Sequence, residues 1–274
     1  MTSTTCATPS DPLEKSAVIY DLVHREKDYD REAAVVAHHL KLVPLSRVVE
    51  FGCGTGNFTH RIMNAGIASI VGVDPSPSML AVCREKLERM RHAHSAKAKV
   101  FSGSIGSILT HESGTPMAFD AAFAMFGVVS YATAHNDLVS ALRNVRGRLT
   151  VGSRFVFDVV NYACCVADFR RNSAVQFARE ETDLADARFG TKEFCLETSV
   201  VTTRFNFVRD GKAQWRETHE MRAFCPREIV DAAPSAGFRV VAQFSDPSSV
   251  AGQENNTTLV NAADYYFWNV LEAT

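Results

Sequence analysis

The sequence predicts an α/β fold, with a Rossmann-like core of seven strands and an antiparallel β-sheet inserted into it as a lid. Two observations carry this prediction. Between residues 47 and 160, short apolar runs alternate with stretches of helical spacing, which is typical of parallel strands joined by crossover helices. Residues 191–224 instead alternate with a period of two around Asp210-Gly211, a pair typical of a hairpin turn.

The elements follow in order along the chain. Strands are expected at 47–51, 69–73, 98–101, 119–126, 154–160, 238–244 and 265–271, and helices at 13–24, 30–42, 57–64, 78–93, 135–149 and 226–236. We expect Asp30 to cap the second helix. Three regions result: a disordered leader at 1–12, a core with N-terminal lid helices at 13–161 and 226–274, and a β insertion at 162–225.

Composition excludes several classes of protein. A net charge of −2 gives no electrostatic case for binding nucleic acid or an anionic membrane surface. No apolar run reaches the ~18–20 residues that cross a bilayer. Seven cysteines without a C-x-x-C pair indicate reduced thiols, no metal site and a cytoplasmic protein. The oligomeric state stays open, and a homodimer is among the alternatives.

The strongest functional signal is a glycine-rich turn between the first expected core strand and the helix after it. Gly52, Gly54 and Gly56 stand at alternate positions, and the acid Glu50 precedes them at the strand end. Such a turn lets a ligand approach the backbone closely, and the following helix N-terminus offers free N–H groups. A dinucleotide fingerprint is G-x-G-x-x-G, so Gly56 comes one residue too early for one.

The turn resembles motif I of the class I S-adenosylmethionine (SAM) methyltransferases, E/D-x-G-x-G-x-G, along its whole length. This resemblance implies SAM as cofactor and S-adenosylhomocysteine (SAH) as product. Asp74, at the end of the second strand, is placed to accept the ribose hydroxyls. Where the family has an acid after the third strand, this chain has Ser104, so either Ser104 or the backbone of Ile105 meets the adenine. The resemblance also implies that four further residues contact the cofactor: Cys53, Pro75, Met79 and Met125.

The N-terminal segment is similar to the leader of the nucleotide-sugar N,N-dimethyltransferases, Y-D-x-x-Y followed by K-D-Y and E-A. By this resemblance Tyr29 touches SAM, Tyr20 faces the substrate, and Asp158 and Asn161 line the substrate site. The subgroup also carries a sheet inserted after its fifth strand. One departure is His24, which stands where the second tyrosine of the leader is expected.

Two further residues are candidates on the acceptor side. Tyr131 follows the fourth strand and is expected to bind substrate. His219 in the insertion is a candidate general base, so that Tyr20 and His219 are the two catalytic candidates. We therefore expect a SAM-dependent methyltransferase acting on a small molecule, by resemblance an amine of a nucleotide-linked sugar. An O-methyltransferase of another metabolite and a non-catalytic SAM-binding protein remain as alternatives. The glycine spacing disfavours an NAD-dependent oxidoreductase.

Overall fold

The computed structural model describes residues 11, 13–90, 97–107, 109, 117–172, 176–181, 186–209, 212–245 and 258–274. Its core sheet has the strand order β3-β2-β1-β4-β5-β12-β10. Strands β1 to β5 are parallel, β12 runs antiparallel to both of its neighbours, and the short β11 pairs with β10. The bounds are β1 Arg47–Phe51, β2 Ser69–Asp74, β3 Lys97–Ser102, β4 Phe119–Ala124, β5 Leu149–Asn161, β10 Phe238–Phe244, β11 Thr258–Leu259 and β12 Tyr266–Ala273. The predicted seven-stranded Rossmann-like core is confirmed.

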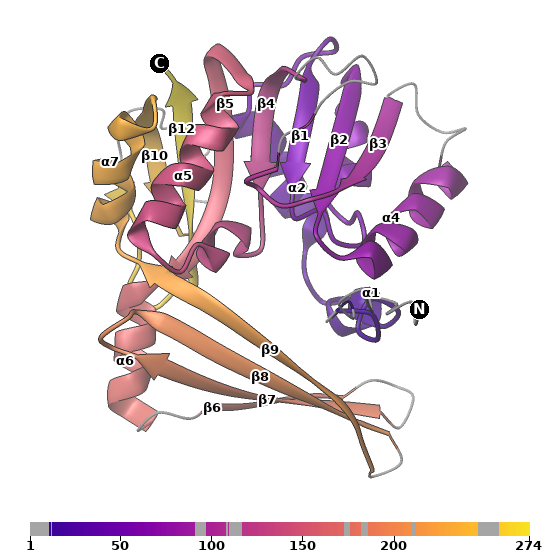
Figure 1. Ribbon diagram of the computed structural model, residues 1–274, viewed down its shortest axis with the longest axis vertical. Coiled ribbons are helices and arrows are strands. Elements are labelled where there is room, and N and C mark those ends of the chain that lie inside the picture. The colour runs from indigo at the N-terminus through magenta and orange to yellow at the C-terminus, as the bar shows by residue number, and fades with distance from the viewer. Residues whose placement is uncertain are drawn as a thin grey trace, which may run out of the picture.

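Helices cover both faces of this sheet (Figure 1). One face packs against α5 and α7, and the other packs against α2 and α3. Because helices cover both faces, the central strands are buried along most of their length, as is usual in parallel sheets. The bounds are α2 Tyr29–His39, α3 Thr59–Met63, α4 Pro77–Met90, α5 His135–Arg146 and α7 Pro226–Ser235.

The insertion leaves the core at the end of β5. The prediction that residues from 162 onward are strand is wrong at its start, where α6 (Tyr162–Asn172) forms. Asn161 Oδ1 accepts the N–H of Ala163 at 3.1 Å, and this contact starts the helix. Four antiparallel strands follow, β6 Gln176–Glu181, β7 Asp186–Cys195, β8 Val200–Arg209 and β9 Lys212–Phe224.

The expected hairpin residues 210 and 211 lie outside the described residues, but β8 and β9 pair antiparallel up to Arg209 and Lys212 on either side of them. The far end of β9 returns to the core, where Ala223 pairs with Val160 of β5. The inserted sheet thereby extends beyond the carboxyl ends of the parallel strands, and α1 lies on the same side of the core (Figure 1).

The N-terminal segment is less helical than expected. Only α1 (Tyr20–Val23) forms where a helix over 13–24 was predicted. Ala17 is buried, but Val18 is 81% exposed and no residue of α1 is buried, so a continuous helix here would bury little apolar surface. The cap of α2 is Asp28, whose carboxylate accepts the N–H of Arg31, and not Asp30. Of the expected leader, Asp11 alone is described; its Oδ2 accepts the N–H of Ser78 at 2.9 Å.

Candidate active site

The glycine-rich turn joins β1 to α3 at the carboxyl edge of the sheet. Gly52, Gly54 and Gly56 all have left-handed backbones, with φ of +71°, +51° and +82°. A Cβ on Gly52 would overlap the Val128 side chain, and one on Gly56 would lie 2.6 Å from Cys83 Sγ. A Cβ on Gly54 would meet nothing within 4 Å. The turn therefore needs glycine for its shape, and its backbone is open to a ligand at Gly54.

Two buried carboxylates hold this turn. Glu50 accepts a hydrogen bond from the hydroxyl of Thr59, and burial raises the pKa of Glu50 well above its usual value. Asp74 Oδ2 accepts the N–H of Gly54 at 2.8 Å, and its Oδ1 accepts the N–H of Ser76 at 2.9 Å. Burial also raises the pKa of Asp74. Asp74 thus lies directly against the open part of the turn.

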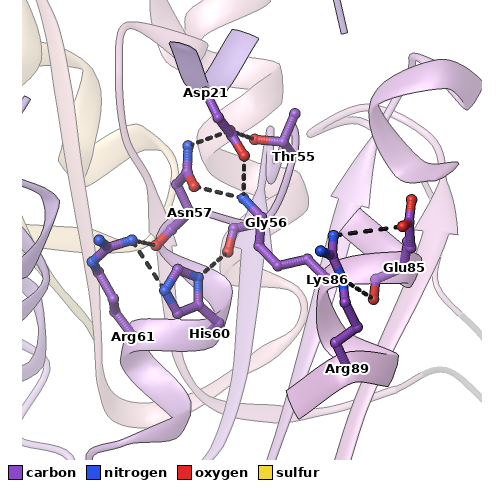
Figure 2. A network of polar contacts seen from close by, with 9 residues as sticks. All are labelled: Asp21, Thr55, Gly56, Asn57, His60, Arg61, Glu85, Lys86 and Arg89. Carbon is purple, nitrogen blue, oxygen red and sulfur yellow. Dashed lines mark hydrogen bonds and ion pairs between the residues drawn. The ribbon is translucent and has the colours of Figure 1, made fainter. Parts of the chain in front are cut away.

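A network of polar contacts fastens α1 to the same turn (Figure 2). The carboxylate of Asp21 accepts hydrogen bonds from Thr55 Oγ1 at 2.6 Å and Asn57 Nδ2 at 2.9 Å, and it pairs with Lys86 Nζ at 2.8 Å. Lys86 also donates to Asn57 Oδ1 at 2.7 Å. Partial burial alone would raise the pKa of Asp21, but its bonds with Lys86, Thr55 and Asn57 outweigh burial and lower it.

The start of α3 is fixed by the second half of this network. His60 Nδ1 contacts the carbonyl of Gly56 at 2.9 Å, and Arg61 donates to the carbonyl of Asn57 at 2.8 Å. The guanidinium of Arg61 also lies 5.3 Å from the ring of Tyr29. Tyr29 is buried beside the turn, where desolvation raises its pKa to about 12.

An aromatic cluster lies between α1 and the carboxyl ends of the strands. The ring of Tyr20 lies 4.6 Å from that of His24, which contacts Phe126 at 5.1 Å. Phe126 contacts Tyr266 of β12 at 6.0 Å. Asp158 holds the turn of Phe126 by accepting the N–H of Gly127 at 2.7 Å, and complete burial raises the pKa of Asp158 to about 7. Asp158 was expected to line the substrate site, and the structure shows that it also holds the backbone of the turn after β4.

Tyr131 and His219, both expected near the acceptor, meet directly although 88 residues separate them. The hydroxyl of Tyr131 lies 2.7 Å from His219 Nδ1. His219 Nε2 lies 3.8 Å from Glu217 Oε2 on the same strand. Desolvation, with the charges of Asp74 and Glu217, raises the pKa of Tyr131 to about 12. The three side chains form a line from the turn after β4 into the inserted sheet.

The remaining predicted residues differ in their burial and in their hydrogen-bond partners. Cys53, Met79 and Met125 are buried, and Pro75 is exposed. Ser104 and Ile105 follow β3, where Ser104 Oγ accepts the N–H of Gly106 at 3.3 Å. Asn161 is fully buried and its amide donates to the carbonyls of Asn261 and Asp264.

Sequence reasoning gave no role to Asp21, Asn57, Lys86 or Glu217. Asp21 is the acid of the Y-D-x-x-Y motif, which was a signal for it. For Glu217 the signal was the period-two alternation of its strand, which puts it on the same face as His219.

Comparison with known proteins gives partial matches in sequence. Residues 49–155 match the model of a family described as a methyltransferase domain. An uncharacterized methyltransferase of Oceanobacillus iheyensis is 44% identical over 83 residues, which are 28% of this chain and 38% of that protein. A trans-aconitate 2-methyltransferase of Variovorax paradoxus is 39% identical over 67 residues, 24% of this chain and 26% of that protein. The chain thus spans less than two fifths of either relative.

Solved structures match nearly the whole chain. The CcbJ methyltransferase from Streptomyces caelestis has a TM-score of 0.76 at 19% identity, covering 96% of this chain and 98% of its own. A SAM-bound amino pentose methyltransferase from Micromonospora echinaspora, involved in calicheamicin biosynthesis, has a TM-score of 0.63 at 15% sequence identity. The match covers 95% of this chain and 97% of that protein's chain. The chain has the fold of the SAM-dependent methyltransferases. The similarity extends far beyond residues 49–155 and takes in the inserted sheet, because 95% or more of this chain is covered.

Within the described part of the chain, none of the helices combines the length and the apolar character that crossing a membrane would take.

Proposed function

We propose that this protein binds SAM at the turn between β1 and α3 and transfers its methyl group to an amine of a small molecule. The observation that carries the proposal is the open backbone at Gly54 beside the buried carboxylate of Asp74. An adenosyl group needs both features, a close approach to main-chain N–H groups and an acceptor for its ribose hydroxyls. Asp74 would hold the ribose, and Met79, Ser104 and Ile105 would surround the adenine.

The chemistry needs little from the protein beyond binding and positioning. SAM, when bound, supplies a methyl group that its sulfonium has already activated. The side chains of this chain would orient the acceptor, keep water out and take up a proton. Tyr20 of the aromatic cluster would orient the acceptor. His219, which contacts the Tyr131 hydroxyl, would receive the proton that the acceptor gives up.

The proposed acceptor is an amine on a sugar, in the first place one linked to a nucleotide. Support comes from the leader motif and from the similar fold of the amino pentose methyltransferase, which covers the inserted sheet as well. We also propose a cytoplasmic location, on the cysteine usage alone.

Two glycines provide a matched test of the cofactor site. Gly54 and Gly66 both have left-handed backbones, and a Cβ would meet no atom within 4 Å at either. Alanine should therefore introduce similar backbone strain at both positions. In Gly54→Ala, however, the added methyl would occupy the open space at the turn. We expect calorimetry to show SAH affinity reduced at least tenfold in Gly54→Ala and unchanged in Gly66→Ala.

Equal SAH affinity in the two folded variants would count against the assigned cofactor site. Transfer of radiolabelled methyl from SAM to a panel of amino sugars tests the activity itself. A wild-type protein that binds SAH but labels neither amines nor hydroxyl compounds would favour a non-catalytic SAM-binding protein. Labelling of hydroxyl compounds alone would favour O-methylation.

A further inference from the structure

Glu217 is a buried carboxylate that lacks a full set of partners. It lies on β9 with 6% of its surface exposed, opposite Phe205 of β8. Among the described residues its Oε1 has no hydrogen-bond partner, and its Oε2 is 3.8 Å from His219 Nε2, beyond hydrogen-bonding distance. Within the described residues, His219 is the ion-pair partner of Glu217. An ionised carboxylate in this position destabilises the fold unless something else compensates it.

The surroundings of Glu217 point to a ligand as that missing partner. In the part of the chain that the structure describes, two more buried polar atoms have no hydrogen-bond partner: the hydroxyl of Thr203, which lies opposite His219, and the indole nitrogen of Trp215, which is on the same strand as Glu217. Alternation along the strands puts all of these side chains on one face of the inserted sheet. Three polar atoms left unpaired on one face would cost several kcal/mol together, at roughly 1–3 kcal/mol for each buried unpaired group.

This face is turned toward the cofactor turn. Tyr131, which lies in the segment after β4, contacts His219 at 2.7 Å. Met221, two residues beyond His219 on the same face of β9, has its Sδ 3.4 Å from the position that a Cβ on Gly127 would take, in the turn after β4. A molecule bound against Glu217 would therefore lie between the inserted sheet and the proposed SAM site.

We infer that Glu217 selects the acceptor, with its Oε1 binding the protonated amine of a polar small molecule. This inference rests on the proposed function and adds to it a residue for substrate selection. A buried carboxylate attracts an ammonium group strongly and repels a carboxylate, so it favours amines over acids. Thr203 and Trp215 would bind further polar atoms of the same molecule.

The same arrangement provides for the proton of the amine. An ammonium nitrogen has no lone pair, so one N–H bond must break, with its electron pair staying on nitrogen and the proton passing to His219 Nε2. His219 is then doubly protonated, with its Nδ1–H donated to the Tyr131 oxygen and its Nε2–H facing Glu217. The negative charge of Glu217 stabilises the positive charge of the His219 imidazolium, as a carboxylate does beside the histidine base of a catalytic triad.

The test compares Glu217→Gln with Glu220→Gln, a control on the exposed face of the same strand. Each protein is assayed for SAH release with paired probes, glucosamine against glucose and further amines against their hydroxyl counterparts. We expect the wild type and Glu220→Gln to prefer the amine of each pair. In Glu217→Gln we expect the KM for amines to rise at least tenfold while SAH affinity stays unchanged.

Thermal unfolding separates this role from a structural one. If Oε1 lacks a protein partner, Glu217→Gln keeps or raises the melting temperature while it loses amine selectivity. A lowered melting temperature with unchanged amine KM would overturn the inference, and so would a preference for hydroxyl compounds. Failure of every amine while SAH still binds would overturn it too. Loss of SAH binding in the wild type would instead refute the proposed function.

Discussion

Removal of the Asp21 carboxylate should release α1 from the glycine-rich turn. No residue of α1 is buried, so its attachment depends on Asp21 and on the ring contacts of Tyr20 and His24. A hydrogen bond to a charged group contributes about 1.5–3 kcal/mol when it is buried. The Asp21 side chain is 45% exposed, and solvent screens its three contacts. We therefore expect Asp21→Ala to cost about 1–2 kcal/mol of α1 docking, a factor of roughly 5–30 in the closed population.

Hydrogen exchange and ligand release measure this directly. In Asp21→Ala the amides of residues 20–24 should exchange faster, and SAH should dissociate roughly 5–30 times faster if α1 covers it. Glu26→Ala is the matched control, since Glu26 is 90% exposed and contacts its neighbour Arg25. Because the pKa of Asp21 is lowered in the folded protein, its contribution is present above its unfolded pKa and is lost as pH falls through the folded value.

The two measurements also show whether Asp21 is needed to hold α1 in place. If exchange at residues 20–24 and the SAH dissociation rate are both unchanged in Asp21→Ala, the other contacts of the N-terminal segment are enough to hold α1, and the role given to Asp21 is wrong. A double-mutant cycle of Asp21 with Lys86 then shows whether the ion pair contributes any coupling energy.

Three other predictions follow from the same geometry. Asp74→Asn should weaken SAH binding roughly 5- to 150-fold in calorimetry, since about 1–3 kcal/mol is lost when buried hydroxyls lose their acceptor; unchanged affinity would contradict the ribose role. Gly52→Ala should unfold at lower temperature than Gly66→Ala, because it adds a clash with Val128 to the same backbone strain; equal melting temperatures would contradict this packing. Asp158 binds its proton more tightly when folded, with a pKa of about 7 against about 4 unfolded, so its contribution to stability declines as pH rises between these values. Urea unfolding at pH 4 and pH 8 measures how much the free energy of unfolding falls between these two pH values, and in Asp158→Asn this fall should be smaller by up to about 4 kcal/mol. An unchanged pH dependence would contradict the assigned role of Asp158.

The sequence predicted those features that depend on local pattern. The parallel core follows from apolar runs of strand length, and the cofactor turn follows from three glycines at fixed spacing, whose left-handed backbones only glycine adopts easily. Asp74 could be placed because strand ends share one edge of a parallel sheet. The helix expected over 13–24 forms only in part, although its apolar residues have helical spacing, because few of them pack against the core: Ala17 is buried but Val18 is 81% exposed.

Other parts of the site were beyond the sequence because they are contacts between distant segments. Asp21 meets residues 34 and 36 positions away in Thr55 and Asn57, and no local pattern encodes such a pair. Asn161 was interpreted as a substrate ligand, yet its amide binds two carbonyls of the chain and its oxygen starts α6. A polar residue at a strand end can serve the fold or the ligand, and only its neighbours distinguish the two.

The two segments that cover the carboxyl edge also contact each other. Lys15, just before α1, has its ammonium 5.8 Å from the ring centre of Trp215 on the inserted sheet. Trp215 is two residues from Glu217 and stacks on Phe207 at 4.3 Å. A displacement of the leader would thus disturb the face on which Glu217 lies, and an acceptor held there would in turn steady the leader. Because α1 is fastened to the cofactor turn by Asp21, binding of SAM and of the acceptor should favour each other, by the reciprocity that links any two coupled sites.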